Sequence, residues 1–402
     1  MNKVITKVNK IFSAISHGKL RDAADELVGP FRRLFVRVCG ELGKSYNFRL
    51  LKNEFSEKRI IVLAPTVDWH MPLYQRPHQL ASAYAKKKNT AVVYMTTNGR
   101  YDNVCSVKKV NENIWCINAR YWELLRDSLS NASEVDLSIS WTPDKEYIEK
   151  LKPSKIIYEY IDELEIFPQY GAEMENDHIE LMKNADVTVC TATKLYNKAV
   201  NLAKNALLSP NAGDYELFSK TGDFEINPLI KNRISGYQHV LGYYGSLASW
   251  FDYDLLVEVA KLHPEWVILL VGYDYDGTFH NSELSKCDNV ICVPAQPYRQ
   301  LPSFLKAFDL AMIPFVINEI TSSTSPVKLF EYMAAGKPIL TSKMPECLKY
   351  QSVVTYKDAN EFCFLAGKLL EMKPDDNYWK LLQEDALNNT WAARTEEILN
   401  SI

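Results

Sequence analysis

Phe315–Leu340 is the segment whose residue types and spacing are best suited to chemistry. It opens where an apolar run ends, continues as a hydroxyl-rich loop, and then shows Ser325-Pro326, predicted to be the N-cap and first residue of a helix. The free backbone N–H groups and positive dipole of such a helix N-terminus suit a phosphate. Lys328 can add a charge to a diphosphate, and the Glu331 carboxylate can accept both hydroxyls of a ribose.

Spacing alone leaves a second interpretation of this pair. Lys328 and Glu331 are three positions apart, so they share one face of the predicted helix. An exposed pair of this kind can be purely structural, and it then stabilises the helix by only about 0.2–0.5 kcal/mol. The position of the pair, where a strand leads into a helix, favours a nucleotide diphosphate site.

The elements that must position these residues are short apolar runs, rich in β-branched residues, that alternate with polar helix-like stretches. Runs that are apolar at nearly every position predict parallel strands covered on both faces. We therefore predict an α/β fold with two doubly wound, Rossmann-like domains of about six strands each. The runs lie at 60–65, 90–95, 135–140, 155–160, 187–190, 206–210, 240–245, 266–272, 289–294, 310–315, 338–342 and 352–356.

The loop-like interval 211–238 is the predicted hinge between these domains. We place the N-terminal domain at 56–225 and the C-terminal domain at 226–376. Residues 377–402 are predicted to form one bracing helix. Ligands of open α/β sheets bind at the carboxyl ends of the strands, so two facing sheets would enclose an inter-domain cleft that holds the active site.

Further candidates follow the carboxyl ends of other predicted strands. Asp68, His70 and Arg76 come after the first strand, where His70 could polarise an acceptor hydroxyl and Arg76 could bind a phosphate. Asp162 follows the fourth strand and could bind an acceptor hydroxyl, and Gly245 could let the backbone approach a diphosphate. The structural alternatives are a paired Arg76, a solvated His70, a helix-capping Asp162 and a tight turn at Gly245.

The run SPVKLFEYMAAGKPIL (325–340) resembles the donor-site signature of GT-B glycosyltransferases. The similarity is to the large retaining family four, in the branch that builds bacterial surface polysaccharides. GYYGSLASWFDYDLL, LLVGY and NVICVPAQPYRQLPSFLKAFDLAMIPF resemble other parts of that donor domain, and DWHMPLYQRPHQLA and YEYIDELEIF more loosely resemble acceptor-domain elements. The likeness covers roughly residues 58–400.

The resemblance implies a role for each part of the donor helix. In that family the helix glutamate holds the donor ribose and a basic residue meets the diphosphate, roles that map onto Glu331 and Lys328. It also implies two facing Rossmann-like domains, a nucleotide-diphosphate sugar as co-substrate, and no metal or other cofactor. His70 joins Lys328 and Glu331 as a catalytic candidate. The donor-binding candidates are Gly245, Ser246, Ser323, Thr324, Ser325, Lys328 and Glu331, and the acceptor-binding candidates are Asp68, His70, Arg76 and Asp162.

Two departures from the family pattern stand out. The family has two glutamates eight positions apart, and the first would fall at Ser323. An Arg and a Lys that commonly follow the glycine turn are absent from GSLASWFDYD, which leaves more of the phosphate contact to Lys328, the helix N-terminus and the loop hydroxyls.

The expected activity is transfer of a sugar from a nucleotide-diphosphate donor onto a polysaccharide or lipid-linked glycan, with retained anomeric configuration. The departing diphosphate gains negative charge in this reaction, so electrostatic stabilisation would supply the catalysis. The alternatives are a nucleotide-sugar epimerase, which needs no acceptor, and a non-catalytic nucleotide-binding scaffold in a glycan assembly complex.

The charge is unevenly distributed. The 402 residues carry a net charge of −4, a balance that argues against general nucleic-acid binding. Residues 1–60, however, hold 13 Lys or Arg and 6 Asp or Glu, a net charge of +7. Apolar residues at helical spacing over 4–15 and 27–38 make residues 1–55 a predicted basic amphipathic helical extension. We expect residues 1–50 to meet an anionic membrane surface; packing on the body or on a partner is the alternative.

The remaining composition points to a folded intracellular chain. The eight cysteines are scattered, without Cys or His clusters at metal-ligand spacing, so we expect free thiols and no metal site. No apolar leader with a small-residue cleavage site and no run of about 18 apolar residues is present. We therefore expect a cytoplasmic protein that attaches peripherally to the inner face of the cell membrane.

Overall fold

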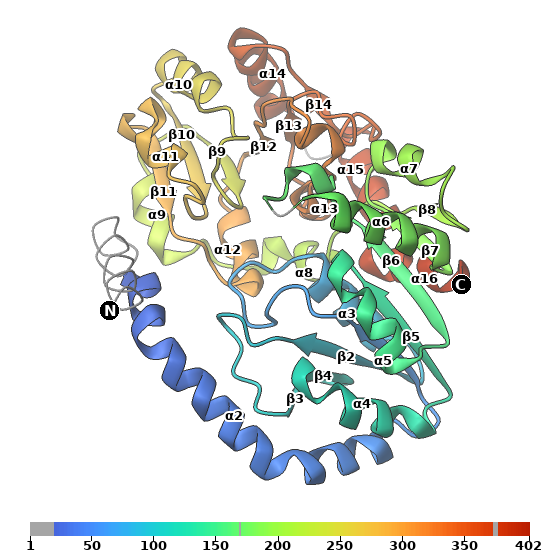
Figure 1. Ribbon diagram of the computed structural model, residues 1–402. Coiled ribbons are helices and arrows are strands. Elements are labelled where there is room, and N and C mark those ends of the chain that lie inside the picture. The colour runs from blue at the N-terminus through green and yellow to red at the C-terminus, as the bar shows by residue number, and fades with distance from the viewer. Residues whose placement is uncertain (1–19, 169, 373–376) are drawn as a thin grey trace. The chain divides into compact units, whose positions relative to one another are not determined.

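The computed structural model describes residues 20–168, 170–372 and 377–402 (Figure 1). The chain divides into two compact units. The first consists of Met1–Met71 and Ala81–Ile157, and the second of Pro72–Leu80 and Tyr158–Ile402. Both units are α/β structures built on parallel strands, as predicted, and each of the twelve predicted strands is present.

In the first unit, β1 (Arg59–Leu63) is a central strand. It pairs in parallel with β2 (Thr90–Thr96) and with β5 (Glu134–Ile139). Beyond β2 the order continues to β4 (Ile114–Asn118) and the antiparallel edge strand β3 (Val107–Asn111). Every residue of β2 is buried, which is why a continuous apolar run marks it in the sequence. The helices of this part are α2 (Leu20–Glu54), α4 (Trp122–Ser128) and α5 (Glu146–Leu151); α3 (Arg76–Ala85) begins in the second unit and ends in the first.

The boundary between the units falls inside β6 (Lys155–Tyr160), at the step from Ile157 to Tyr158. In the second unit, β7 (Val187–Cys190) and β8 (Ala206–Leu208) follow β6 in strand order, and β7 pairs in parallel with β8. The helices between these strands are α6 (Ala172–Asn184) and α7 (Thr193–Ala199).

The second unit also holds a six-stranded sheet with the order β11-β10-β9-β12-β13-β14 and parallel pairing throughout. Its strands are β9 (His239–Tyr244), β10 (Trp266–Val271), β11 (Val290–Val293), β12 (Leu310–Ile313), β13 (Ile339–Thr341) and β14 (Val354–Thr355). β10 is buried along its whole length. The helices are α8 (Tyr215–Phe218), α9 (Pro228–Ile234), α10 (Tyr253–Leu262), α11 (Thr278–Asn281), α12 (Leu301–Leu305), α13 (Val327–Ala334), α14 (Ala359–Glu371), α15 (Asn377–Asn388) and α16 (Trp391–Asn400).

The N-terminal helix α2 is one continuous helix of 35 residues, drawn in blue in Figure 1. Its last turns belong to the core of the first unit, because Phe48 is 4% exposed and Leu51 is 2% exposed. The helix packs against α4 and β3. The second predicted amphipathic helix is therefore part of a longer element, and the first, over 4–15, lies outside the described residues.

The C-terminal segment forms two helices where one was predicted. α15 ends at Asn388, and Thr390 adopts an extended conformation and caps α16, its side chain accepting a hydrogen bond from the Ala393 N–H. A Thr side chain satisfies a free N–H group at a helix start, so the Asn-Asn-Thr sequence breaks the helix. Among the helices that the structure describes, none has the length and apolar character needed to span a bilayer.

Candidate active site

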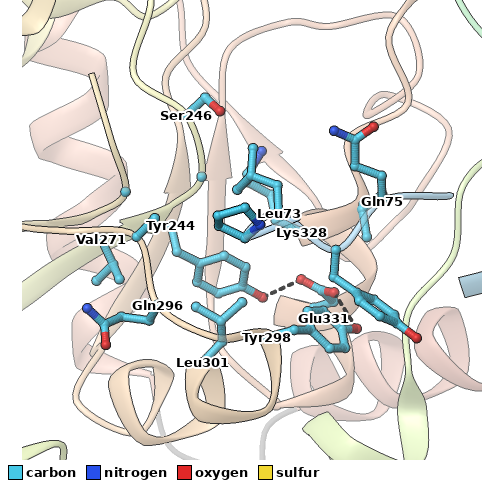
Figure 2. Close-up of a pocket in the computed structure, with 16 residues that line it drawn as sticks. Leu73, Gln75, Tyr244, Ser246, Val271, Gln296, Tyr298, Leu301, Lys328 and Glu331 are labelled. Atoms are coloured by element: carbon cyan, nitrogen blue, oxygen red, sulfur yellow. Dashed lines mark hydrogen bonds between the residues drawn. The ribbon is translucent and has the colours of Figure 1, made fainter. Parts of the chain in front are cut away.

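One pocket of the second unit brings the two central candidates together (Figure 2). Its volume is about 210 Å³, and it lies where loops leave the carboxyl ends of β9, β10 and β11 and where α13 begins. Ligands of open α/β sheets bind at this edge. The lining includes Tyr74, Tyr244, Gly245, Ser246, Gly272, Gln296, Tyr298, Lys328 and Glu331.

Two glycines keep the backbone of this pocket free of side chains. Gly245 has a φ of +139°, and a Cβ there would lie 3.0 Å from Cε of Lys328. A Cβ at Gly272 would lie 1.8 Å from the carbonyl oxygen of Gly245. No larger residue fits at either position without displacing backbone or Lys328, so the close backbone approach predicted at Gly245 has a structural basis.

Lys328 brings an unneutralised cation to the pocket. Its Nζ lies 5.1 Å from the ring centroid of Tyr243 and 5.2 Å from that of Phe315. Within residues 20–168, 170–372 and 377–402, no hydrogen bond or ion pair engages this Nζ. Burial lowers the pKa of Lys328 to about 8, although the nearby charge of Glu331 opposes the shift. A desolvated ammonium held by aromatic rings gains free energy from binding an anion, which suits a diphosphate.

Glu331 is only 2% exposed, and each of its oxygens accepts a hydrogen bond from a tyrosine. Tyr244 Oη donates to Oε2 at 2.6 Å and Tyr298 Oη donates to Oε1 at 2.8 Å (Figure 2). Burial raises the pKa of Glu331 to about 7, and the two hydrogen bonds limit that rise. Each oxygen keeps a further lone pair, so the ionised carboxylate can still accept the hydroxyls of a diol.

Sequence reasoning did not single out Tyr244 or Tyr298. They lie 87 and 33 positions from their partner Glu331, so no local spacing links them to it. Tyr298 also stacks on Tyr74, with ring centroids 4.7 Å apart. Tyr244 ends β9 and Tyr298 follows β11, so a search for hydroxyl-bearing side chains at strand ends could have found both.

The three loop hydroxyls predicted to meet the donor do not line this pocket. Ser323 Oγ donates to Oε1 of Glu163 at 2.9 Å, and Thr324 Oγ1 donates to a backbone carbonyl at 2.7 Å. Ser325 Oγ accepts the backbone N–H of Asn211 at 3.2 Å. Protein groups therefore engage all three hydroxyls.

The donor helix begins one residue later than predicted. Pro326, in place of Ser325, occupies the N-cap position of α13, and no side chain caps the helix. Ser325 cannot serve as the cap because its hydroxyl and carbonyl are both engaged by Asn211. Lys328 and Glu331 still share one face of α13, and both reach the pocket.

Glu163 places a carboxylate beside Ser323, the position where the resemblance expects a glutamate. Its oxygens also lie 3.1 Å from Nζ of Lys194 and 2.5 Å from Nζ of Lys198. Burial opposes ionisation, but the hydrogen bonds from Lys198, Ser323 and Lys194 outweigh it and lower the pKa of Glu163. The chain thus holds an ionised carboxylate here that comes from the loop after β6.

Asp68, a predicted acceptor ligand, holds together a loop of the first unit. Its carboxylate accepts the backbone N–H groups of Gly99, Arg100 and Tyr101 at 3.0, 2.5 and 2.6 Å. Burial opposes ionisation, but these backbone hydrogen bonds lower the pKa of Asp68. The carboxylate is occupied by the loop after β2, so the structure gives the predicted acceptor contact no support.

His70 forms a dyad with Asp102 in the first unit. Nδ1 of His70 lies 2.6 Å from Oδ1 of Asp102, which is fully buried and also accepts the backbone N–H of His70 at 3.0 Å. The carboxylate assigns the imidazole proton to Nδ1, and Nε2 then faces Nζ of Lys108 at 3.3 Å. The His70 side chain is 37% exposed, so a ligand can reach it.

Arg76 is buried and paired in the second unit. The side chain is 5% exposed, Nε donates to Oε2 of Glu159 at 2.8 Å, and Nη1 donates to Asn211 at 3.2 Å. This pairing favours the structural alternative, but Nη2 has no hydrogen-bond partner among the described residues, so binding of an acceptor phosphate stays a prediction. Asp162 is half-buried in the same unit, and burial together with the charge of Glu163 raises its pKa.

The structure also describes the thiols and the arrangement of possible metal ligands. All eight cysteines are free thiols. In the part of the chain that the structure describes, no group of three or more His, Cys, Asp or Glu side chains is arranged to hold a metal ion. Metal independence itself remains a prediction from the resemblance.

Comparison with known proteins places the pocket in a recognised domain. Residues 238–371 match the family model described as "Glycosyl transferases group 1". A curated relative, the putative teichuronic acid biosynthesis glycosyltransferase TuaH of Bacillus subtilis (strain 168), is 25% identical over 237 residues. That alignment covers 56% of this chain and 59% of the relative, so the chain spans little more than half the relative's length.

Solved structures show the fold over most of the chain. Sucrose-phosphate synthase from Thermosynechococcus elongatus has a TM-score of 0.60 at 14% identity and covers 86% of this chain and 98% of its own. Anabaena Alr3699/HepE in complex with UDP and glucose has a TM-score of 0.61 at 12% identity, covering 86% and 99%. Residues 238–371 therefore match a group 1 glycosyl transferase domain, and most of the chain has the GT-B fold of these solved structures.

Proposed function

We propose that this protein transfers a sugar from a nucleotide-diphosphate donor onto a polysaccharide or lipid-linked glycan of the bacterial cell surface. The observation that carries the proposal is the pocket in which the unpaired Lys328 cation and the buried Glu331 carboxylate line the same glycine turn. The relative TuaH, named for teichuronic acid biosynthesis, supports a surface polysaccharide as the product. HepE was solved with UDP and glucose, which supports a uridine diphosphate carrier here, whose ribose has both the 2′ and 3′ hydroxyls.

In the proposed reaction Lys328 stabilises the leaving diphosphate. Negative charge develops on the departing oxygen as the bond to the anomeric carbon breaks, and a preorganised cation is worth most where that charge appears. The ammonium is already desolvated and held by the rings of Tyr243 and Phe315, so little reorganisation accompanies the reaction. Gly245 supplies backbone that can approach the same diphosphate.

Glu331 is proposed to hold the donor ribose. Its remaining lone pairs can accept the 2′ and 3′ hydroxyls once the carboxyl is ionised. Since burial raises the pKa of Glu331 to about 7, donor binding should strengthen as the pH rises through neutrality.

We propose that the anomeric configuration is retained, with the leaving phosphate taking the acceptor proton and no protein nucleophile involved. No metal ion is required in this scheme. His70 is the proposed contact to the acceptor hydroxyl, because Asp102 fixes its ring and the side chain is 37% exposed; the hydroxyl would replace Lys108 at Nε2. The half-buried Asp162 is the second proposed acceptor ligand.

The decisive experiment offers the full chain a panel of UDP- and dTDP-sugars. A specific donor should raise the melting temperature, since a ligand that binds only the folded state stabilises it. The same donor, labelled and mixed with glycan and lipid-linked acceptors, should pass its label to product with unchanged anomeric configuration, as read by NMR. An inverted product would contradict retention.

Two further outcomes would replace the proposal. A sugar isomerised in the absence of any acceptor would identify an epimerase. Donor binding without transfer to any acceptor extract would identify a nucleotide-binding scaffold.

For location, we propose a cytoplasmic protein that attaches peripherally to the inner face of the membrane through α2. One face of this helix is apolar yet exposed: Phe31 is 75%, Phe35 65% and Leu42 85% exposed. These positions repeat at helical spacing, and residues 31–54 hold six Lys or Arg against two Glu. Apolar and basic character combined on one helix supports binding in an anionic lipid interface.

A further inference from the structure

A second cavity, of about 280 Å³, lies in the first unit and is lined by four arginines. Arg32, Arg33 and Arg37 come from α2, and Arg120 comes from the short 3-10 helix Ala119–Tyr121. Thr97, Asn98, Asn118 and Val36 complete the lining, so no acidic side chain faces the cavity.

The cavity has a rigid floor at the carboxyl edge of the first unit's sheet. Asn118 ends β4, and Asn98 follows β2. Nδ2 of Asn98 donates to the carbonyl of Val104 at 3.0 Å, and the Val104 N–H returns a bond to Oδ1 at 2.7 Å. Nδ2 of Asn118 donates to the same carbonyl at 3.1 Å, so both asparagines are fixed. The site lies at the edge where ligands of such sheets bind.

Arg32 is preorganised by carbonyl groups, which leave its charge intact. Nη1 donates to the carbonyl of Asp102 at 2.8 Å, and Nη2 donates to the carbonyl of Gly99 at 3.1 Å. Its Nε is buried and, within the described part of the chain, has no hydrogen-bond partner. An orphaned buried donor on a fixed guanidinium indicates a missing acceptor.

The other three guanidiniums are barely neutralised. Among residues 20–168, 170–372 and 377–402, no ion pair or hydrogen bond engages the charged groups of Arg33 or Arg37. Arg120 has only a distant contact, 3.9 Å, with Glu41. Four positive charges around one cavity repel one another, and the attraction of each to a bound anion would offset that repulsion.

We propose that this arginine cavity binds a phosphate-class anion, with a diphosphate as its best ligand. Planar guanidinium forks match phosphate oxygens bidentately, which favours this chemistry over a lone carboxylate. A cavity of about 280 Å³ has room for a diphosphate. The ligand can be a free anion or the diphosphate of a lipid, whose chain would lie along α2; both present the same oxygens. The proposal is independent of the donor pocket and of the transfer reaction.

The test measures binding of inorganic diphosphate to the full chain by calorimetry. The double variant Arg33→Gln with Arg37→Gln should weaken binding at least tenfold, and Arg49→Gln, a change on the same helix outside the cavity, should leave it unchanged. Each measurement is repeated in the Lys328→Ala background, so that binding at the donor pocket is removed. Arg33, Arg37 and Arg49 are all exposed, so we expect the variants to fold. Melting temperatures equal to that of the wild type without ligand will confirm this.

A second arm separates the two sources of the anion. Phosphatidylcholine vesicles with and without a polyprenyl diphosphate are sedimented with each variant. Capture that needs the polyprenyl diphosphate and is lost in the double variant identifies a lipid ligand, whereas binding of inorganic diphosphate alone identifies a soluble one. Equal diphosphate binding by wild type and double variant, or equal loss in Arg49→Gln, overturns the proposal.

Discussion

The phenol of Tyr244 donates a 2.6 Å hydrogen bond to the carboxylate of Glu331, joining the end of strand β9 to helix α13. Burial raises the pKa of Glu331 to about 7, and this bond is the largest of the effects that limit the rise. Tyr244 thereby favours the ionised form of Glu331, the group proposed to hold the ribose.

Tyr244→Phe should raise the pKa of Glu331 further, because it removes a hydrogen bond to the ionised form. A bond worth about 1 kcal/mol corresponds to a shift of about 0.7 pH unit. The acid limb of kcat/KM for the donor, expected near pH 7, should move upward by that amount. Tyr356→Phe is the matched control, since its buried hydroxyl has no partner among the described residues. The same pH dependence of kcat/KM in the Tyr244→Phe and Tyr356→Phe variants would show that Tyr244 does not affect the pKa of Glu331.

Lys328→Met should lower kcat about 10²–10³-fold, the usual cost of losing one group that stabilises developing negative charge. Methionine fills the space between Tyr243 and Phe315 and removes a desolvated charge, so the melting temperature should stay equal or rise. Lys368→Met is the control, because its Nζ also lies over a ring, 4.2 Å from that of Phe364. Activity of the Lys328 variant within twofold of the control would exclude an electrostatic role.

Glu331→Gln should change how stability depends on pH. A carboxyl with a folded pKa of about 7 and an ordinary value of 4.5 binds its proton more tightly in the folded state. Its contribution to stability is therefore complete below about pH 4.5 and is lost as the pH rises to 7, by up to about 3 kcal/mol. Glutamine cannot ionise, so the variant should gain stability relative to wild type between pH 5 and pH 8. Thermal melting at pH 5 and at pH 8 gives the stability difference between the variant and the wild type. The same stability difference at both pH values would contradict the raised pKa.

Phe35→Ser combined with Leu42→Ser should weaken binding to phosphatidylglycerol vesicles at least tenfold. Each side chain is more than half exposed, so the change removes apolar contact with lipid at little cost to folding. Phe364→Ser, at a position 61% exposed on α14, is the control for a general loss of surface apolarity. Sedimentation that is equal in the two variants would rule out α2 as the attachment.

Deletion of residues 1–50 is a poor test of the same idea. Phe48 lies within the deleted segment and is 4% exposed, and Leu51 next to its end is 2% exposed. Removing them would open the core of the first unit, so lost vesicle binding would not be specific. Point substitutions on the exposed face avoid this ambiguity.

Buried strands were predictable because each of their residues faces protein. β2 and β10 are buried at every position, and their sequences are correspondingly apolar without interruption. β3 was missed because its residues VKKVN are half-buried or exposed on a sheet edge, where no apolar run is needed. β4 (IWCIN) was missed as well, although every one of its residues is buried, so the hydrophobic pattern identified most but not all of the interior strands.

The candidate site was predictable only where its residues are neighbours in sequence. Lys328 and Glu331 are one helical turn apart, and the pocket contains both. Arg76 and Glu159 are 83 positions apart, so their buried ion pair could not be read from spacing. Ser323 and Glu163 are 160 positions apart, so the hydrogen bond between them could not be read from spacing either.

The continuity of α2 has a consequence for orientation. The stretch from Phe31 to Leu51 is about 30 Å of unbroken helix, with exposed apolar side chains at one end and core side chains at the other. An unbroken helix of this length is rigid. A membrane surface that binds its N-terminal turns therefore also fixes the orientation of the first unit's sheet relative to that surface. Attachment through α2 would then set the orientation of the His70 imidazole relative to the membrane as well as hold the protein there.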